Sequence, residues 1–278
     1  MTSDNLLALK GITKEYKEFC LGPLDLSVPR GYVMGLVGAN GAGKTTAIKI
    51  ALGAVLPGNG SAHLIHKTRV GVVLDQPCWQ ATWRVRDLSR LLGPFYPGWD
   101  QRVFDELCEW AGASQRLKVR EFSRGMGMKV QVAVALAHRA ELLVLDEPTS
   151  GLDPLARGEL LDKLSEFMTD ERHSVLFSTH ITTDLDRMAD LVTILDAGRV
   201  IASGARDDLL EAWAMVRGGA ADLTGELRAR IRGLRQHSAG WEGLIAAADL
   251  GLCGTGVVAD TPSVEDLLVH LTKERKDA

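Results

Sequence analysis

The sequence predicts an α/β fold in which a mostly parallel β-sheet is connected by helices and interrupted by a helical insert. Short apolar runs typical of buried strands occur before residue 75 and again between residues 142 and 196. Helical segments separate the later runs, and this alternation favours parallel strands joined by crossovers. From about residue 80 to 140 the pattern is helical only, which predicts the insert.

The composition is that of an ordinary globular chain. The 278 residues are 46% apolar and 24% charged, which suffices for a substantial core. Lys and Arg number 32 against 36 Asp and Glu, a formal net charge of −4. This balance argues against nucleic acid as a partner, because phosphate backbones require a basic surface. No apolar run suits a membrane span or a signal peptide, and four scattered cysteines predict a cytoplasmic location.

Seven segments have the pattern of strands, and Gly or Pro residues mark the first turns between them. We expect strands at residues 6–10, 23–28, 32–37, 69–74, 142–145, 174–178 and 191–196. We expect helices at residues 44–52, 101–111, 126–137 and 263–271. A further helix begins at Pro154 after the capping residue Asp153. A weaker helical pattern includes Arg228 and Arg235.

A glycine-rich segment lies between the third expected strand and the first expected helix. Residues 38–45, GANGAGKT, match G-x-x-x-x-G-K-[ST]. Glycines let backbone N–H groups wrap a phosphate, and the next helix directs its positive dipole end at the same anion. Lys44 can reach the terminal phosphates, and the Thr45 hydroxyl can hold magnesium. The sequence thus predicts a nucleoside triphosphate site at Gly38, Asn40, Gly41, Ala42, Gly43, Lys44, Thr45 and Thr46.

Two carboxylates stand at the end of a later apolar strand. Residues 142–145 lead directly into Asp146 and Glu147. In phosphate-loop enzymes a carboxylate at such a strand end helps to hold magnesium. The next residue, Glu147, can orient an attacking water and partly deprotonate it. The pair therefore indicates a triphosphatase.

Between Phe122 and His180 the chain resembles the ATP-binding subunit of ATP-binding cassette (ABC) transporters. Residues 122–126, FSRGM, stand where that family has its signature Leu-Ser-Gly-Gly-Gln. Residues 145–154, LDEPTSGLDP, match its magnesium strand, catalytic glutamate and D-loop, and His180 matches its switch histidine. Gln76 matches the Q-loop glutamine, and Tyr16 the adenine-stacking tyrosine. These motifs cover about residues 6–210.

The resemblance implies a phosphate-loop NTPase (RecA-like) core with an N-terminal antiparallel β subdomain. An ATPase domain would occupy residues 1–214, with the insert at about 80–140, and residues 215–278 would form a small C-terminal extension. The implied cofactors are ATP and Mg²⁺. The resemblance assigns catalysis to Glu147, His180 and Gln76, and magnesium binding to Thr45, Gln76 and Asp146. It adds nucleotide contacts from Tyr16, Ser123 and Gly125 to those of the phosphate loop.

The resemblance also implies partners. Two such domains would pair head to tail, as a homodimer or a heterodimer, and sandwich two ATP molecules. Ser123 and Gly125 of one subunit would complete the phosphate site that Lys44 begins in the other. Ser123 suits a helix N-cap, and Gly125 leaves its amide open to phosphate. The pair would drive a separate membrane permease, which would place the protein on the inner face of the cell membrane.

Two positions depart from the signature. Arg124 replaces a glycine, so it either adds charge near the phosphates or points to solvent, and Met126 replaces the glutamine. A basic residue at position 124, together with residues 95–100, resembles the bacterial drug and antibiotic-peptide export subgroup. This implies export of a drug, peptide or lipid-like substrate. Trp79 and Trp83 either line a groove for the permease or belong to the core of the insert.

Other functions remain as alternatives. One is a soluble ABC ATPase that acts on ribosomes or nucleic acid, although relatives of that kind usually carry two cassettes or coiled-coil arms. A GTPase switch would need an Asn-Lys-x-Asp guanine-binding motif, which the sequence lacks. A regulatory module that senses ATP would lack magnesium-dependent turnover.

Overall fold

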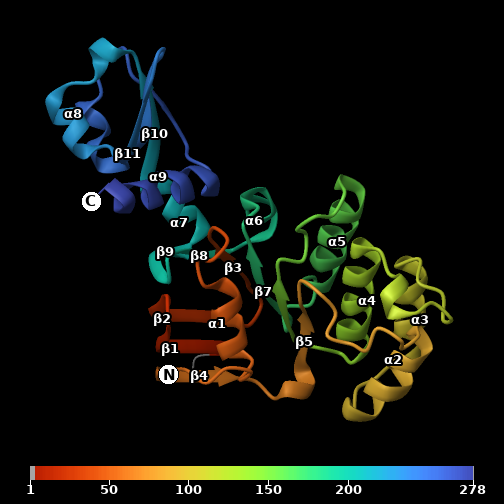
Figure 1. Ribbon diagram of the computed structural model, residues 1–278. Helices are drawn as coiled ribbons and strands as arrows, with labels where there is room; N and C mark the ends of the chain where they lie inside the picture. The colour runs from red at the N-terminus through yellow and green to blue at the C-terminus, as the bar shows by residue number, and fades with distance from the viewer. Residues whose placement is uncertain (1–3, 278) are drawn as a thin grey trace.

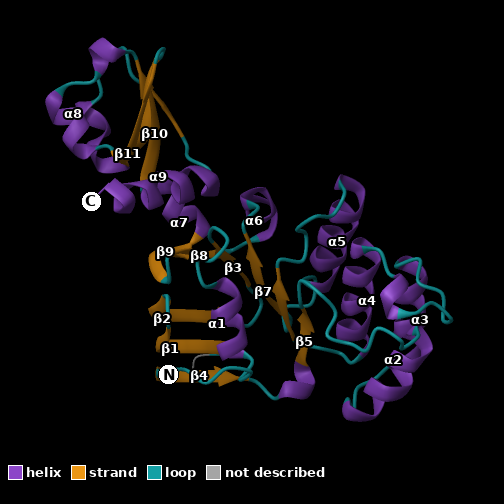
Figure 2. Cartoon of the chain, viewed as in Figure 1, coloured by secondary structure: helices purple, strands orange, loops and turns teal. Residues whose placement is uncertain are grey.

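A computed structural model of the chain describes residues 4–277, and within that range the strands form three sheets. Figure 1 shows the central sheet between an antiparallel sheet on one side and the helical insert on the other, with the C-terminal sheet standing apart. Figure 2 shows helices in the insert, around the central sheet and beside the C-terminal sheet. The strand and helix pattern confirms the α/β prediction.

The central sheet has the strand order β5-β6-β7-β3-β8-β9. Its first five strands are parallel to their neighbours, and only β9 is antiparallel. Asp146 pairs with Ser178, and Val37 pairs with Thr179, so the strands that precede the predicted site residues end at one edge. The bounds are β3 (Val33–Val37), β5 (Val70–Val73), β6 (Leu142–Asp146), β7 (Ser174–Thr179), β8 (Leu191–Asp196) and β9 (Arg199–Ala205).

An antiparallel sheet in the order β2-β1-β4 is formed by β1 (Asn5–Tyr16), β2 (Phe19–Pro29) and β4 (Asn59–Leu64). Its apolar side chains share one buried cluster with α1 (Lys44–Ala51) and with the near face of the central sheet. Leu7, Ile12 and Leu24 of this sheet, for example, are fully buried in the same cluster as Ile48 and Leu36. The phosphate loop that precedes α1 is therefore held between two sheets.

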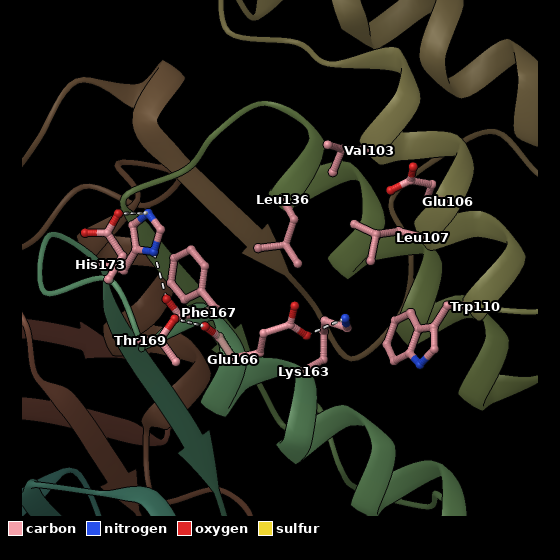
Figure 3. Close-up of a pocket in the computed structure, with 11 residues that line it drawn as sticks. Val103, Glu106, Leu107, Trp110, Leu136, Lys163, Glu166, Phe167, Thr169 and His173 are labelled. Atoms are coloured by element: carbon pink, nitrogen blue, oxygen red, sulfur yellow. Dashed lines mark hydrogen bonds and ion pairs between the residues drawn. The ribbon is translucent and has the colours of Figure 1, made fainter.

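The insert contains α2 (Val85–Leu92), α3 (Gln101–Trp110) and α4 (Arg124–Ala137). It has its own apolar cluster, against which Trp79 and Trp83 pack while each remains partly exposed. Burial in this cluster raises the pKa of the Cys108 thiol to about 12. A cavity of about 380 Å³ lies between α3 and the end of α5 (Pro154–Phe167), and Trp110, Lys163 and His173 are among its lining residues (Figure 3).

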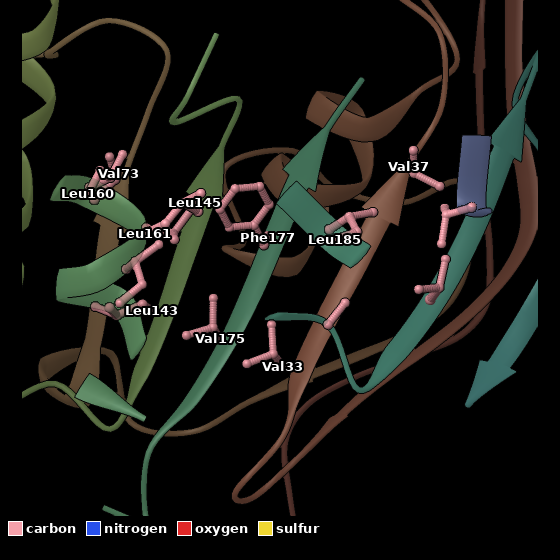
Figure 4. Close-up of a cluster of buried hydrophobic side chains, with 14 of the residues drawn as sticks. Val33, Val37, Val73, Leu143, Leu145, Leu160, Leu161, Val175, Phe177 and Leu185 are labelled. Atoms are coloured by element: carbon pink, nitrogen blue, oxygen red, sulfur yellow. The ribbon is translucent and has the colours of Figure 1, made fainter. Parts of the chain in front are cut away.

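The main core lies on the opposite face of the central sheet. Leu143, Leu145 and Phe177 point from the sheet toward Leu160 and Leu161 of α5 (Figure 4). The helix α6 (Thr182–Met188) covers the same face nearer to β3. This packing fixes the ends of β6 and β7, where the predicted catalytic residues begin.

Residues 213–277 form a four-stranded antiparallel sheet in the order β11-β12-β10-β13 with flanking helices. The expected helix through Arg235 is wrong beyond Arg230. A Cβ at Gly233 would lie 2.1 Å from the His270 carbonyl oxygen, and the residue has φ +57°, so the chain leaves the helix and enters a strand. The elements are β10 (Trp213–Gly218), β11 (Arg232–His237), β12 (Gly240–Ala246), β13 (Val258–Asp260), α7 (Arg206–Glu211), α8 (Gly225–Arg230) and α9 (Val264–Asp277).

Short 3₁₀ helices occur at η1 (Lys67–Arg69), η2 (Gly93–Phe95), η3 (Val119–Glu121), η4 (Ala220–Asp222) and η5 (Ala247–Leu252). Among residues 4–277, no helix has both the length and the apolar character that crossing a bilayer requires.

Candidate functional site

The phosphate loop connects β3 to α1 and surrounds a cavity of about 400 Å³. Gly43 has φ +110° at the N-terminus of α1, a conformation that other residues rarely adopt. At Gly38 a Cβ would lie 2.3 Å from the Leu195 carbonyl oxygen, so only glycine fits. This cavity, here called the phosphate cavity, is lined by Phe19, Asn40, Gly41, Ala42, Gly43, Lys44, Thr45, Thr46 and Glu147.

Lys44 directs its ammonium group into the loop. Its Nζ donates hydrogen bonds to the carbonyl oxygens of Gly38 at 2.7 Å and Ala39 at 3.2 Å. The same Nζ lies 2.9 Å from Glu147 Oε1. The side chain is 5% exposed, so this cation depends on those oxygen atoms rather than on water. A terminal phosphate in the cavity would offer the ammonium a stronger partner.

Glu147 joins Lys44 to His180. Its Oε2 lies 2.6 Å from His180 Nδ1, while its Oε1 faces Lys44. Oε1 is buried and has no partner of good hydrogen-bond geometry among the described residues. Glu147 also has φ +52°, which is unusual for a residue with a side chain, and its N–H donates to the Ser178 carbonyl at 3.0 Å. Strained backbones of this kind cluster at functional sites.

Asp146 is buried one residue earlier, at the end of β6. The Ser178 hydroxyl donates to its Oδ1 at 2.6 Å, which fixes the carboxylate direction. Thr45, the residue directly after Lys44, lines the phosphate cavity. Carboxylate and hydroxyl oxygens are ligands that Mg²⁺ prefers, and the partner-poor Oε1 of Glu147 can accept from a magnesium-bound or attacking water. The donor set present therefore fits magnesium.

The signature residues lie in a different cavity. Ser123 caps α4, since its Oγ accepts from the Met126 N–H at 3.2 Å, as its position before the helix predicts. Ser123, Gly125 and Asp153 line a second cavity of about 530 Å³, here called the signature cavity. Asp153 caps α5, and hydrogen bonds from the amides of Ala156 and Leu155 lower its pKa. Within one chain, Ser123 and Gly125 do not line the phosphate cavity.

Two further predicted residues lie away from the phosphate cavity. Gln76 follows β5 and lines a third cavity of about 230 Å³ with Asp75 and Ser123. Tyr16 ends β1 with about half of its surface exposed. Its ring centroid lies 6.4 Å from that of Phe19, which does line the phosphate cavity.

Sequence reasoning missed Phe19 and the roles of Ser178 and Gln131. Phe19 pairs with Tyr16 across a hairpin, and a Cβ on Gly43 would lie 2.9 Å from its ring. An aromatic pair flanking a two-residue turn was the available signal. Gln131 is a buried amide within the otherwise apolar run of α4, which was also visible. Ser178 carried no signal, because its bond to Asp146 depends on strand register.

The cavity between α3 and α5 brings together none of the predicted residues. Its Lys163 pairs with Glu166 at 2.6 Å, and His173 Nδ1 lies 2.8 Å from the Phe167 carbonyl oxygen, as Figure 3 shows. These polar groups therefore have hydrogen-bond or ion-pair partners within the cavity lining. The chemistry is therefore assigned to the edge of the central sheet.

Comparison with known proteins agrees with this geometry. Residues 21–150 match the ABC transporter family. The chain is 34% identical over 223 residues to Nod factor export ATP-binding protein I of Cupriavidus pinatubonensis, covering 74% of this chain and 68% of the relative. It is 28% identical over 214 residues to bacitracin transport ATP-binding protein BcrA of Enterococcus faecalis, covering 72% and 70%.

Solved structures show the same fold. An ATP-binding subunit of an ABC transporter superposes with a TM-score of 0.64 at 28% identity, covering 73% of this chain and 91% of the other. A dimeric ATP-binding cassette bound to ADP and Pi superposes with a TM-score of 0.63 at 21% identity, covering 72% and 98%, which supports the fold alone. The phosphate loop, the Glu147 contacts and these similarities lead to one conclusion. The chain belongs to the ABC transporter family, as an ATP-binding subunit that hydrolyses ATP.

Proposed function

We propose that this chain hydrolyses magnesium-ATP in the phosphate cavity and uses a paired copy to complete the site, so that a membrane permease exports its substrate. The observation that carries the proposal is the chain of contacts from Lys44 through Glu147 to His180. It joins a lysine and a carboxylate that line the phosphate cavity to a histidine that contacts the carboxylate. Hydrolysis of a terminal phosphate requires groups of these kinds.

Each residue has a defined task. The amides of the phosphate loop and Lys44 bind and orient the phosphates. When a terminal phosphate replaces Glu147 Oε1 as the partner of the Lys44 ammonium, Oε1 becomes free to hold the attacking water and accept its proton. His180, held by Glu147 Oε2, is placed to donate to the terminal phosphate. Tyr16 and Phe19 offer aromatic surface for the adenine base.

Magnesium belongs to this proposal because the oxygen donors suit it. Thr45 and Asp146 would hold the ion, and Gln76 would join them after a movement of its loop. Bound magnesium would neutralise charge between the two outer phosphates. The Ser178–Asp146 hydrogen bond supports this assignment, since it fixes the direction of the Asp146 carboxylate.

Pairing is proposed because one chain holds only part of the site. Ser123 and Gly125 line the signature cavity rather than the phosphate cavity. A second copy placed head to tail, or a similar subunit, would bring its Ser123 hydroxyl and Gly125 amide to the phosphates. ATP then stabilises the closed pair, and loss of phosphate lets it open.

The direction of transport follows the relatives. Nod factor export ATP-binding protein I, a bacitracin transport ATP-binding protein and this chain share most of the cassette. We infer a bacterial-type exporter of a drug, peptide or lipid-like compound, with the chain held at the inner face of the cell membrane by its permease. A formal net charge of −4 supports transport over action on ribosomes or nucleic acid.

The test is the Glu147→Gln variant. We expect ATP affinity to stay within about threefold, while turnover falls by about 10²–10⁴-fold, because the amide keeps the shape but cannot accept a proton. Magnesium-dependent phosphate release and equilibrium ATP binding measure the two effects. Glu109→Gln, an exposed change on α3, is the matched control and should leave both unchanged. Equal turnover in the two variants would refute the proposal.

A further inference from the structure

Arg124 lines the signature cavity beside Ser123 and Gly125, and its guanidinium is held there by two other segments of its own chain. It is the first residue of α4, directly after Ser123. Its Nε donates to the Ser150 carbonyl oxygen at 2.5 Å, and its Nη2 forms an ion pair with Asp75 Oδ1. A Cβ on Gly151 would lie 3.0 Å from the Arg124 Nε, so the side chain lies directly over this glycine.

Both partners of Arg124 belong to segments that carry site residues. Asp75 directly precedes Gln76. The Ser150 N–H donates to the Glu147 carbonyl oxygen at 3.2 Å, so Ser150 closes the turn that begins at Glu147. One guanidinium therefore connects the segment of Gln76 with the turn of Glu147, starting from the residue next to Ser123.

The same helix holds the Gln76 segment at a second point. Gln131 is buried, and its amide accepts from the Leu74 N–H and donates to the Leu74 carbonyl, both at 3.0 Å. Residues 124 and 131 are about two turns apart, so they lie on one side of α4. Leu74 and Asp75 are thereby fixed to α4 through backbone and side chain together.

We propose that Arg124 is a positioning residue for ATP hydrolysis, which ties the Ser123 segment to the loop of Gln76 and to the turn of Glu147. The inference rests on the proposed function. In a pair of subunits, Ser123 serves the partner's nucleotide, whereas Gln76 and Glu147 serve their own. Through Arg124, a movement of Ser123 at the partner's nucleotide is therefore transmitted to Gln76 and Glu147 at the chain's own nucleotide.

Arginine is suited to this task and lysine is not. A planar guanidinium can donate from Nε to one oxygen and from Nη2 to another at a fixed angle. A lysine ammonium could keep the Asp75 pair but would lose the fixed direction to Ser150. Both charged groups are partly exposed, with 38% and 50% of their side-chain surface open, so the pair adds little to the stability of the fold. Its removal should change catalytic geometry instead.

The test is a double-mutant cycle on the full chain with Arg124→Ala, Asp75→Ala and both together. We expect each single change to lower kcat by about 5–30-fold, with KM for magnesium-ATP within about threefold, because small misplacements of site groups are costly. The double variant should match Arg124→Ala, since the two residues act as one unit. Arg124→Lys should recover part of kcat, and exposed Arg116→Ala, the control, should behave as wild type.

Three results would overturn the inference while wild type hydrolyses ATP normally. One is a lower kcat in Arg124→Ala with no effect of Asp75→Ala, which would mean that Arg124 acts on the nucleotide itself. The second is a raised KM at constant kcat, and the third is simple additivity in the double variant. A wild-type chain without magnesium-dependent turnover would instead refute the proposed function, and this inference with it.

Discussion

At the scale of residues, we expect Lys44 to decide how strongly the phosphate cavity binds an anion. Its buried ammonium is held by two backbone carbonyls and Glu147. Lys44 supplies the one positive charge among the residues found to line this cavity. Lys44→Ala should weaken ATP binding by about 10–100-fold, the loss expected for a charge-assisted hydrogen bond. Equilibrium binding of ATP measures this. Lys49→Ala, an exposed change on the same helix, should bind as wild type, and equal affinities would contradict this role.

Single residues were predictable where a short sequence motif by itself indicates the chemistry of its residues. The glycines, Lys44 and the Asp146–Glu147 pair follow from local pattern, and the structure gathers them at the end of the central sheet. The contacts of Arg124 were not predictable, because they depend on which segments meet in space. The ion pair of Arg124 with Asp75 joins residues 49 positions apart in the sequence.

At the scale of elements, periodicity predicted the five parallel strands of the central sheet and several of the long helices, because burial on one or both faces leaves a regular pattern. It did not predict the antiparallel edge strand β9 (Arg199–Ala205). It failed at Arg232–His237, where arginines suggested a helix but the backbone conformation of Gly233 breaks it.

The packing of α9 against the rest of the chain was also not predictable from the sequence. The Val264 N–H donates to the Asp186 carboxylate at the start of this helix, and burial raises the pKa of Asp186.

The helix α9 shares the core of the cassette. Leu267 is 1% exposed and belongs to the same buried cluster as Leu185 of α6 and Leu145 of β6. Leu267→Ala should lower the free energy of unfolding by about 2–5 kcal/mol, through lost burial and a cavity. Urea unfolding checks this, with Leu56→Ala as the control, since Leu56 is 79% exposed and its loss should cost under about 0.5 kcal/mol. Equal midpoints for the two variants would show that α9 is not part of this core.

At the scale of the whole molecule, the residues of the proposed site line two separate cavities of the cassette. The phosphate cavity holds Lys44 and Glu147, while the signature cavity holds Ser123 and Gly125. The sequence predicted both sets of residues, and in the structure Ser123 and Gly125 do not line the phosphate cavity of their own chain. The account therefore depends on two copies that close over ATP.

Sedimentation velocity of the Glu147→Gln variant tests this dependence most directly. With saturating magnesium-ATP we predict a species of twice the 30.1 kDa chain mass, and with ADP a monomer. Adding Ser123→Arg should abolish the dimer while each chain still binds ATP, because the bulky side chain blocks the signature cavity. A Glu147→Gln chain that binds ATP and still sediments as a monomer would contradict the account.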